Sequence, residues 1–507
     1  MNILRIVTIA ICALLCTPQN NASSLISDVA TTITDHPYIT AACVSGSALG
    51  VYALDAYVYH TPLKWDWSKI DTNNINFPED FLWGNATSAP QIEGGSTNSN
   101  WTMWEQQQTD PNFRPAGLAC DHWNRYKEDA RLAKEAGLNA LGISLSWDKI
   151  EPKEGEFNEE AIEHYVDVCK TLNSYGVRPI VCFHFYTHPQ WFEEKGAFEN
   201  EENIAYFVRF CTIMFDRLHK HVYQWLTFTN PTSYAIKAYK EAMMTPGVRN
   251  MQRMQNALKN MLEAHTQVYH ACKKCEGGAT SQIGIKHTQF LVEAWNPYNP
   301  LDRLAARMAF YLFSENVYTY FTTGTFKTHI PGYVNVYHHN PLGAQSLDFI
   351  VCCYYSHGYI KNFKAVRDPQ ELAIDNHPLY SVYPEGVYRA IKEMYDYVAK
   401  PLDIPIYLSG NGIGTLNKEI RNTYVKRSVY AMSQAIADGY PVQGYWPWSM
   451  LDNYEWGTFD KEYGIYATDR ETLDRTLRAD HPYYQVLQRF SNNRQTNTAT
   501  TTTSSLG

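Results

Sequence analysis

The chain has 507 residues, of which 45% are hydrophobic and 19% are charged. This is a globular composition, and it excludes a disordered or fibrous protein. The chain carries 43 Lys and Arg against 52 Asp and Glu, a formal net charge of −9, so no basic surface is available for a nucleic acid partner. Aromatic residues make up 14% of the chain, which favours stacking on flat or sugar-like ligands.

The first part of the chain, residues 1–71, predicts a signal-like and membrane-anchoring region. Its opening apolar stretch is too short to span a bilayer, but residues 38–59 form a second apolar segment that is long enough. Trp65 and Trp67, with Lys64 beside them, are then expected at the membrane interface. We expect a membrane-associated protein, with the side of the membrane left open. The alternative is a soluble helix rich in Ser and Thr.

Cysteine usage predicts a largely reduced protein. The chain has 11 Cys, an odd number, and Cys182, Cys352 and Cys353 lie in apolar runs where thiols behave as small hydrophobic groups. Cys272 and Cys275 form a single CxxC. Because a structural zinc site needs four ligands, we interpret these two as surface thiols of a helix. The sequence predicts neither a metal nor a cofactor.

Short apolar runs alternate with amphipathic stretches throughout residues 72–490. Helical periodicity is clear at residues 120–137 and 159–176, and each of these stretches ends at a Gly. Eight runs have the character of strands: residues 81–86, 141–147, 178–185, 225–230, 282–290, 349–355, 404–410 and 442–450. The pattern predicts an α/β fold of the (β/α)8, or TIM, barrel type. The polar tail, residues 491–507, is predicted to be disordered.

The ends of these strands resemble glycoside hydrolase family 1, the group of retaining β-glucosidases and β-galactosidases. The matching stretches include FPEDFLWGNATSAPQIEG, HFYTHPQWF, WLTFTNP and YPVQGYWPWSMLDNYEWGTFDKEYGIYATD. The resemblance implies the same barrel over residues 76–489. It also implies a site at the carboxyl ends of the strands.

The two carboxylates that the family uses for catalysis are replaced in this chain. The family's acid/base lies in a W-x-T-F-N-E-P stretch, where this sequence has Asn230. Its nucleophile lies in a T-E-N-G stretch, where this sequence has Gly410. Retaining hydrolysis needs both carboxyl groups facing the sugar, so we expect no intact catalytic pair.

A supporting Arg of the family is also missing. The family's R-F-S-I-S-W pattern begins here at Gly142. This loss is coherent with the first, because an Arg whose carboxylate partner has gone becomes an unpaired buried cation.

The residues that bind the sugar in the family have counterparts in this chain. The resemblance implies that two of them bind ring hydroxyls, that a Trp stacks on the ring, and that a Glu-Trp pair takes further hydroxyls. Taken singly, four of them have an ordinary explanation: the two Trp as core aromatics, the His as a buried histidine and the Glu as a surface acid. The counterparts are Gln91, His184, Tyr355, Trp448, Glu455 and Trp456.

These observations favour a catalytically impaired member of the family, a pseudo-β-glucosidase that keeps a carbohydrate-binding pocket. Its expected ligand is a β-linked sugar or glycoside, and a protein partner is the other candidate. The alternative is an active β-glycosidase that hydrolyses O-glycosyl bonds, or transglycosylates, with non-standard catalytic residues.

Overall fold

A computed structural model describes residues 62–373 and 381–490. The chain divides into two compact units. The described part of the smaller unit comprises Pro62 and residues 293–306 and 360–364. Within it, the backbone N–H of Asn362 donates to Asp302 Oδ1 at 2.8 Å. The larger unit contains all the other described residues.

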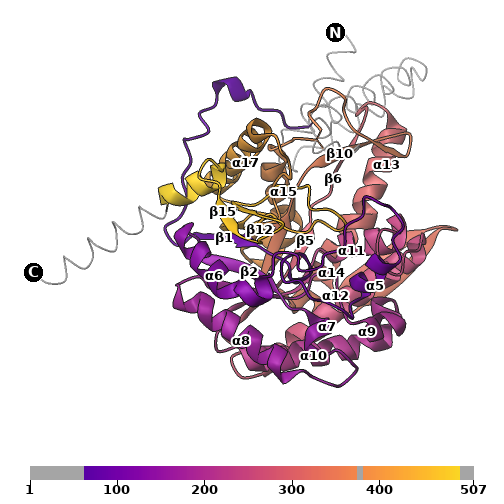
Figure 1. The fold of residues 1–507 in the computed structure, drawn as a ribbon. Helices are drawn as coiled ribbons and strands as arrows, with labels where there is room; N and C mark the ends of the chain where they lie inside the picture. The colour runs from indigo at the N-terminus through magenta and orange to yellow at the C-terminus, as the bar shows by residue number, and fades with distance from the viewer. Residues whose placement is uncertain (1–61, 374–380, 491–507) are drawn as a thin grey trace, which may run out of the picture. The chain divides into compact units, whose positions relative to one another are not determined.

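The larger unit is built on a closed barrel of parallel strands (Figure 1). Around the barrel, the order is β1, β2, β3, β4, β5, β9, β12 and β13, which closes on β1. Each of the eight predicted runs overlaps one barrel strand, so the (β/α)8 prediction is confirmed. The bounds are β1 Leu82–Ala86, β2 Ala140–Ser144, β3 Arg178–His184, β4 Gln224–Thr229, β5 Gln282–Thr288, β9 Phe349–Cys353, β12 Ile406–Ser409 and β13 Val442–Trp446.

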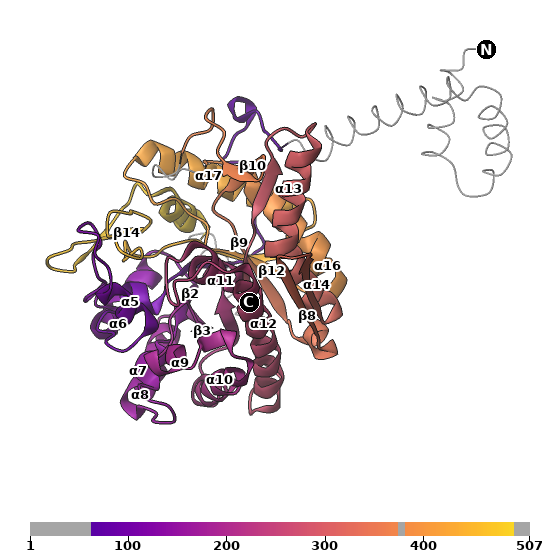
Figure 2. The same ribbon diagram turned by 90° about the vertical axis from the view of Figure 1, so that its right-hand side faces the viewer.

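Helices connect the strands, and Figure 2 shows α8, α10 and α12 on the outer side of the barrel. Both predicted helices form, as α6 and α8. The α-helices are α4 Ala89–Ile92, α5 Asn100–Gln106, α6 His122–Glu135, α7 Trp147–Ile150, α8 Glu159–Ser174, α9 Gln190–Glu194, α10 Ile204–Leu218, α11 Pro231–Ile236, α12 Met251–Lys274, α13 Pro300–Phe310, α14 Asn316–Thr323, α15 Gly386–Met394, α16 Lys400–Leu402 and α17 Lys418–Ala437.

Several smaller elements were not predicted. Strands β7 and β8 pair as an antiparallel hairpin, as do β14 and β15. The π-helical turns η4, η5 and η7 interrupt or extend three helical segments. The bounds of these and the remaining elements are β6 Leu291–Ala294, β7 Thr325–Ile330, β8 Val334–His339, β10 His357–Lys361, β11 Lys364–Val366, β14 Tyr466–Thr468, β15 Arg475–Leu477, η1 Trp67–Lys69, η2 Ala197–Glu199, η3 Glu201–Asn203, η4 Lys237–Glu241, η5 Tyr311–Glu315, η6 Pro341–Gln345 and η7 Tyr395–Ala399.

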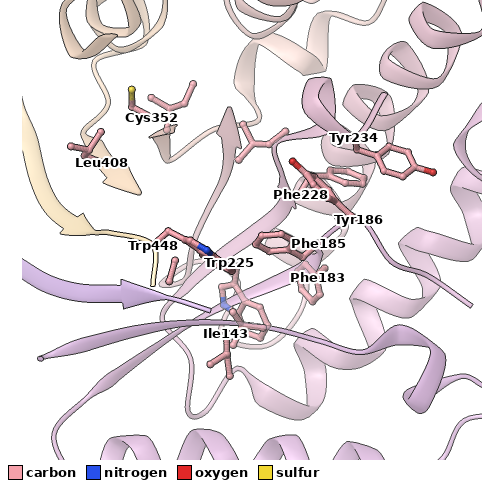
Figure 3. Packing of buried hydrophobic residues seen from close by; sticks show 14 of the residues in the cluster. Ile143, Phe183, Phe185, Tyr186, Trp225, Phe228, Tyr234, Cys352, Leu408 and Trp448 are labelled. Carbon is pink, nitrogen blue, oxygen red and sulfur yellow. The ribbon is translucent and has the colours of Figure 1, made fainter. Parts of the chain in front are cut away.

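Two cores result from this arrangement. The larger one lies between the strands and the surrounding helices, and Figure 3 shows part of it. The smaller one fills the barrel interior, as expected for inward-facing side chains of a TIM barrel. It consists of Leu82, Ala140, Ile180, Cys182, Leu226, Phe349, Val351, Tyr407 and Trp446. This interior core fills the barrel beneath the carboxyl ends of its strands.

The predicted signal sequence, the apolar segment 38–59 and the tail 491–507 lie outside the described residues. Within the described ranges, no helix is both long enough and apolar enough to cross a bilayer. The two tryptophans expected at a membrane interface have partners within the larger unit. The Trp65 ring lies 5.7 Å from that of Tyr430 on α17, and Trp67 Nε1 donates to Glu385 Oε1 at 2.7 Å.

The cysteines that the structure describes are all free thiols. Cys272, interpreted above as a surface thiol, is buried within α12, whereas Cys275 at the end of that helix is partly exposed. Among residues 62–373 and 381–490, no group of three or more His, Cys, Asp or Glu side chains could hold a metal ion.

Candidate functional site

The candidate site lies where the barrel strands end. Asn230 follows β4 directly and Gly410 follows β12 directly. Tyr355 and Trp448 each come two residues after a strand, β9 and β13. Parallel barrel strands present their carboxyl ends at one face, which is where TIM-barrel enzymes carry out their chemistry. The topology therefore gathers four of the predicted site residues at one mouth of the barrel.

The two positions that lack the family's carboxylates meet at a single thiol. Asn230 Nδ2 donates to Cys353 Sγ at 3.4 Å, and Cys353 Sγ donates to the carbonyl oxygen of Gly410 at 3.3 Å. Asn230 Oδ1 is buried and has no hydrogen-bond partner among the described residues. An amide and a thiol thus stand between the two predicted catalytic positions.

A lysine that sequence reasoning missed completes this group. Lys286 lies on β5 and is only 3% exposed. Gly410 has φ +68°, and a Cβ atom built on it would lie 2.8 Å from Lys286 Nζ and 2.9 Å from Cys353 Sγ. The ammonium nitrogen therefore lies close to the space where any side chain at position 410 would begin. The available signal was a charged residue inside the apolar run IGIKHT.

Burial lowers the pKa of Lys286, and the thiols of Cys353 and Cys182 oppose this only in part. Within the described part of the chain, its amine forms no hydrogen bond or ion pair. Nor does any carboxylate there hydrogen-bond to Asn230 or Cys353. Among the described residues, hydrogen bonds therefore bring no pair of acidic side chains to Asn230 and Gly410.

Three of the predicted sugar-binding residues form a second group. Trp448 Nε1 donates to Glu455 Oε1 at 2.7 Å. Gln91 is buried, and its Nε2 donates to the carbonyl oxygen of Tyr454 at 2.6 Å. Burial raises the pKa of Glu455 to about 7, against the opposing influence of the Trp448 hydrogen bond and the Lys237 charge. This carboxyl group titrates near neutral pH.

An aromatic wall with one lysine adjoins this group. The rings of Tyr186 and Trp456 lie 5.6 Å apart, and Lys237 Nζ lies 5.7 Å from the first ring and 6.0 Å from the second. The ring of Phe185 lies 5.9 Å from that of Trp448. Figure 3 shows Phe185 and Tyr186 gathered on one side of Trp448. Phe185, Tyr186 and Trp448 are themselves buried, at 9%, 6% and 6% exposure. Aromatic rings of this kind suit stacking on a pyranose where one face is open.

His184 lies in a buried group of its own with His188 and Glu193. It is fully buried, and its Nε2 lies 3.2 Å from His188 Nδ1. His188 Nε2 in turn lies 2.7 Å from Glu193 Oε2. Burial holds the pKa of His184 well below its ordinary value. His184 Nδ1 is buried without a partner among the described residues, and no direct contact joins His184 to Trp448 or Glu455 there.

Tyr355 is partly buried beside the first group. Burial raises the pKa of its hydroxyl well above the ordinary value, and the nearby Cys353 thiol adds to that rise. Its backbone carbonyl accepts a hydrogen bond from the hydroxyl of Tyr424 on α17, at 2.7 Å. Tyr355 therefore has a neutral hydroxyl, and Tyr424 holds its backbone in place.

A cavity of about 350 Å³ is lined in part by Ala89, Pro90 and Trp101, and by none of the six predicted sugar-binding residues. Two carboxyl groups, Asp148 and Glu105, also line it. Burial raises the pKa of both of them. The volume is within the range of small-molecule sites.

The chain is similar to known proteins over most of its length. The model of glycosyl hydrolase family 1 matches residues 73–493. Beta-glucosidase A from Thermotoga maritima is 27% identical over 448 residues, which cover 81% of this chain and 97% of that protein. A 6-phospho-beta-galactosidase from Streptococcus mutans is also 27% identical, with 81% and 97% covered.

The solved structures that resemble this one include a beta-glycosidase from Pyrococcus horikoshii. It has a TM-score of 0.73 and 30% sequence identity, and the match covers 82% of this chain and 96% of that one. The beta-glucosidase from Thermotoga maritima in complex with glucoimidazole gives a TM-score of 0.73 at 26% identity, with 82% and 99% covered.

Proposed function

The chain belongs to glycosyl hydrolase family 1, and from this premise we propose that it binds a β-glycoside at the barrel mouth without cleaving it by the two-carboxylate reaction. The observation that carries the proposal is the group formed by Asn230, Cys353 and Lys286 around the two catalytic positions. An amide replaces the acid/base, a glycine replaces the nucleophile, and a thiol and an amine lie beside them.

The family reaction requires one carboxyl group to protonate the leaving oxygen and another to attack the anomeric carbon. General acid catalysis alone contributes a factor of about 10²–10⁴. Asn230 cannot transfer a proton in this way, and Gly410 has no side chain. The absence of an acidic partner around Asn230, Cys353 and Lys286 in the described residues supports the loss of this route.

The group that would hold the sugar supports the binding half of the proposal. Glu455 and Gln91 offer hydrogen-bonding oxygens and nitrogens beside the indole of Trp448, and Trp456 lies with Tyr186 at the adjoining wall. Complexes of the relative from Thermotoga maritima with glucoimidazole and castanospermine are consistent with a sugar-shaped ligand. A protein partner at the same mouth is the remaining candidate.

The test uses the full chain. We expect no release of p-nitrophenol from its β-glucoside, β-galactoside, β-mannoside or β-fucoside, and we expect a rise in melting temperature with at least one methyl β-glycoside. Trp448→Ala should remove that rise, whereas Tyr337→Ala, a change at an exposed tyrosine of β8, should not. Turnover at ordinary glycosidase rates would contradict the impaired reaction, and a lack of any binding would contradict the glycan pocket.

A second candidate function, an active glycosidase with non-standard residues, is favoured by one observation. Asp148 and Glu105 line the same cavity, and burial raises the pKa of both carboxyl groups, as acid catalysts require. If p-nitrophenol is released, Asp148→Asn and Glu105→Gln should each abolish the release. Activity that survives both changes would exclude this assignment.

We also propose that residues 38–59 associate the protein with a membrane. The support is the length and apolar character of that segment. Flotation with liposomes should carry the full chain upward and leave behind a chain from which 38–59 has been deleted. Equal flotation of the two proteins would contradict the anchor.

A further inference from the structure

Lys286 projects from the barrel wall into the site rather than into the helical layer. On β5 it stands opposite Thr229 of β4 and Val351 of β9. Its nitrogen reaches to within 2.8 Å of the position of a Cβ on Gly410, at the end of β12. The side chain therefore crosses from β5 toward β12 at the level where the strands end and ligands of this fold bind.

Within residues 62–373 and 381–490, no carboxylate forms a hydrogen bond or an ion pair with this amine. The titratable groups that face it are the thiols of Cys353 on β9 and Cys182 on β3. A buried lysine without an anionic partner favours its neutral form, and a neutral amine has a free lone pair. Desolvation in an apolar pocket is one of the ways in which proteins activate lysine as a nucleophile toward carbonyl compounds.

We propose that Lys286 forms an imine with an aldehyde ligand at the barrel mouth, and that this ligand is a reducing sugar in its open-chain form. The choice of a sugar rests on the proposed function, but the reactivity of the amine does not. Because the amine stands at the position of the missing nucleophile, a sugar held there presents its C1 carbon toward Lys286.

The step balances without a further reactant. The Lys286 nitrogen attacks the carbonyl carbon, one N–H proton passes to the carbonyl oxygen, and a carbinolamine results. Loss of that hydroxyl with the second N–H proton releases water and leaves the C=N bond. Asn230 lies beside this point through its contact with Cys353. Its unpartnered Oδ1 supplies a hydrogen-bond acceptor for the carbinolamine hydroxyl.

The experiment traps the imine with a reductant. The full chain is incubated at pH 7 with glyceraldehyde and, separately, with glucose, each with sodium cyanoborohydride, and the modified lysines are identified by peptide mass spectrometry. A lysine with a pKa of about 10.4 is almost wholly protonated at pH 7, so we expect Lys286 to be alkylated about tenfold or more faster than an exposed lysine. Lys69 and Lys153, 81% and 75% exposed, are the internal references.

Variants make the assignment specific. Lys286→Arg and Lys286→Met should both lose the fast modification, and Lys69→Arg should keep it. Circular dichroism establishes that each variant is folded. If Lys286 in the folded wild-type protein is modified no faster than Lys69, the inference is overturned.

Binding of a methyl β-glycoside, which has no free aldehyde, separates the two proposals. Glycoside binding without modification of Lys286 overturns the imine and leaves the proposed function standing. Fast modification by glyceraldehyde, with neither modification by glucose nor glycoside binding, supports a reactive amine but overturns a hexose as its ligand and, with it, the proposed sugar pocket.

Discussion

At the scale of single residues, the buried amine of Lys286 has a cost that stability measurements can detect. Its pKa is lowered in the folded protein, whereas the unfolded pKa is about 10.4. Between the folded and the unfolded pKa, the unfolded chain binds more protons than the folded one, so the free energy of unfolding rises with pH. We expect Lys286→Met to raise the free energy of unfolding at pH 7 by about 1–3 kcal/mol. The gain should shrink toward pH 10.

Urea denaturation at pH 7 and pH 10 measures this effect. Lys153→Met, at an exposed lysine, is the control and should change little at either pH. A stability for Lys286→Met below that of the wild type at pH 7 would mean that the amine has a favourable partner in solution.

Glu455 has the opposite effect on how stability changes with pH. Its pKa is raised to about 7 in the folded protein, so from about pH 4.5 to 7 the folded state binds more protons and stability falls as pH rises. One pKa unit corresponds to about 1.4 kcal/mol. We therefore expect Glu455→Gln to stabilise the protein at pH 8 by up to about 3 kcal/mol, and to have little effect at pH 4.5.

Thermal unfolding across this pH range measures the prediction. The amide oxygen of the new Gln can still accept from Trp448 Nε1, so the packing is retained. A stability difference that does not depend on pH would show that Glu455 is not the group that titrates.

The candidate site could be predicted in part from these single residues. Asn230 and Gly410 could be located because Pro231 and Asn411 keep the register of two known motifs. Lys286 could not, because a lysine in an apolar strand gives no sign of whether it points inward. The sequence also could not show that His184 would direct one ring nitrogen to His188, four residues away.

At the scale of elements, the N-cap of α17 joins this helix to the loop that begins at Gly410 after β12. Asn417 Oδ1 accepts hydrogen bonds from the backbone N–H groups of Glu419 and Ile420, at 3.0 and 3.2 Å. Removing an N-cap side chain costs about 1 kcal/mol. We expect Asn417→Ala to lower the free energy of unfolding by this amount in urea denaturation, and Asn417→Asp to be neutral because the carboxylate also caps. An equal loss in both variants would argue against the cap.

The barrel strands and two of the helices could be predicted, whereas the hairpin of β7 and β8 could not, for a physical reason. Barrel strands are buried on both faces and appear as apolar runs, so all eight were found. Helices α6 and α8 have a buried stripe, including Ala130 and Ala133 on the first, and were also found. The hairpin of β7 and β8 alternates buried and exposed residues, and lies between helical patterns that obscure it.

At the scale of the whole molecule, the prediction of a (β/α)8 barrel followed from the count and spacing of strands alone. What the sequence could not give was the set of contacts that join distant parts of the chain. Trp65 illustrates this, because its ring packs against Tyr388 and Tyr430, more than 300 positions along the chain.

A buried ion pair joins the early and late parts of the barrel chain in the same way. Arg475 on β15 contacts Asp129 on α6 at 2.7 Å, with side-chain exposures of 0% and 1%, and His122 Nδ1 lies 2.7 Å from the same carboxylate. Burial would raise the pKa of Asp129, but the hydrogen bonds from His122 and Arg475 outweigh it and hold the pKa below its ordinary value. The contribution to stability is therefore present above about pH 4 and is lost as pH falls through the lower folded pKa.

We expect Asp129→Asn to lower the free energy of unfolding by about 3 kcal/mol at pH 7, because it leaves the Arg475 cation buried without its partner. Urea denaturation measures the loss, and below pH 3 the difference between variant and wild type should diminish. Glu135→Gln on the same helix is the matched control. Its partner Arg131 is 46% exposed, so this pair should contribute at most about 0.5 kcal/mol. Similar losses in the two variants would mean that the Asp129–Arg475 pair does not hold the two parts of the barrel chain together.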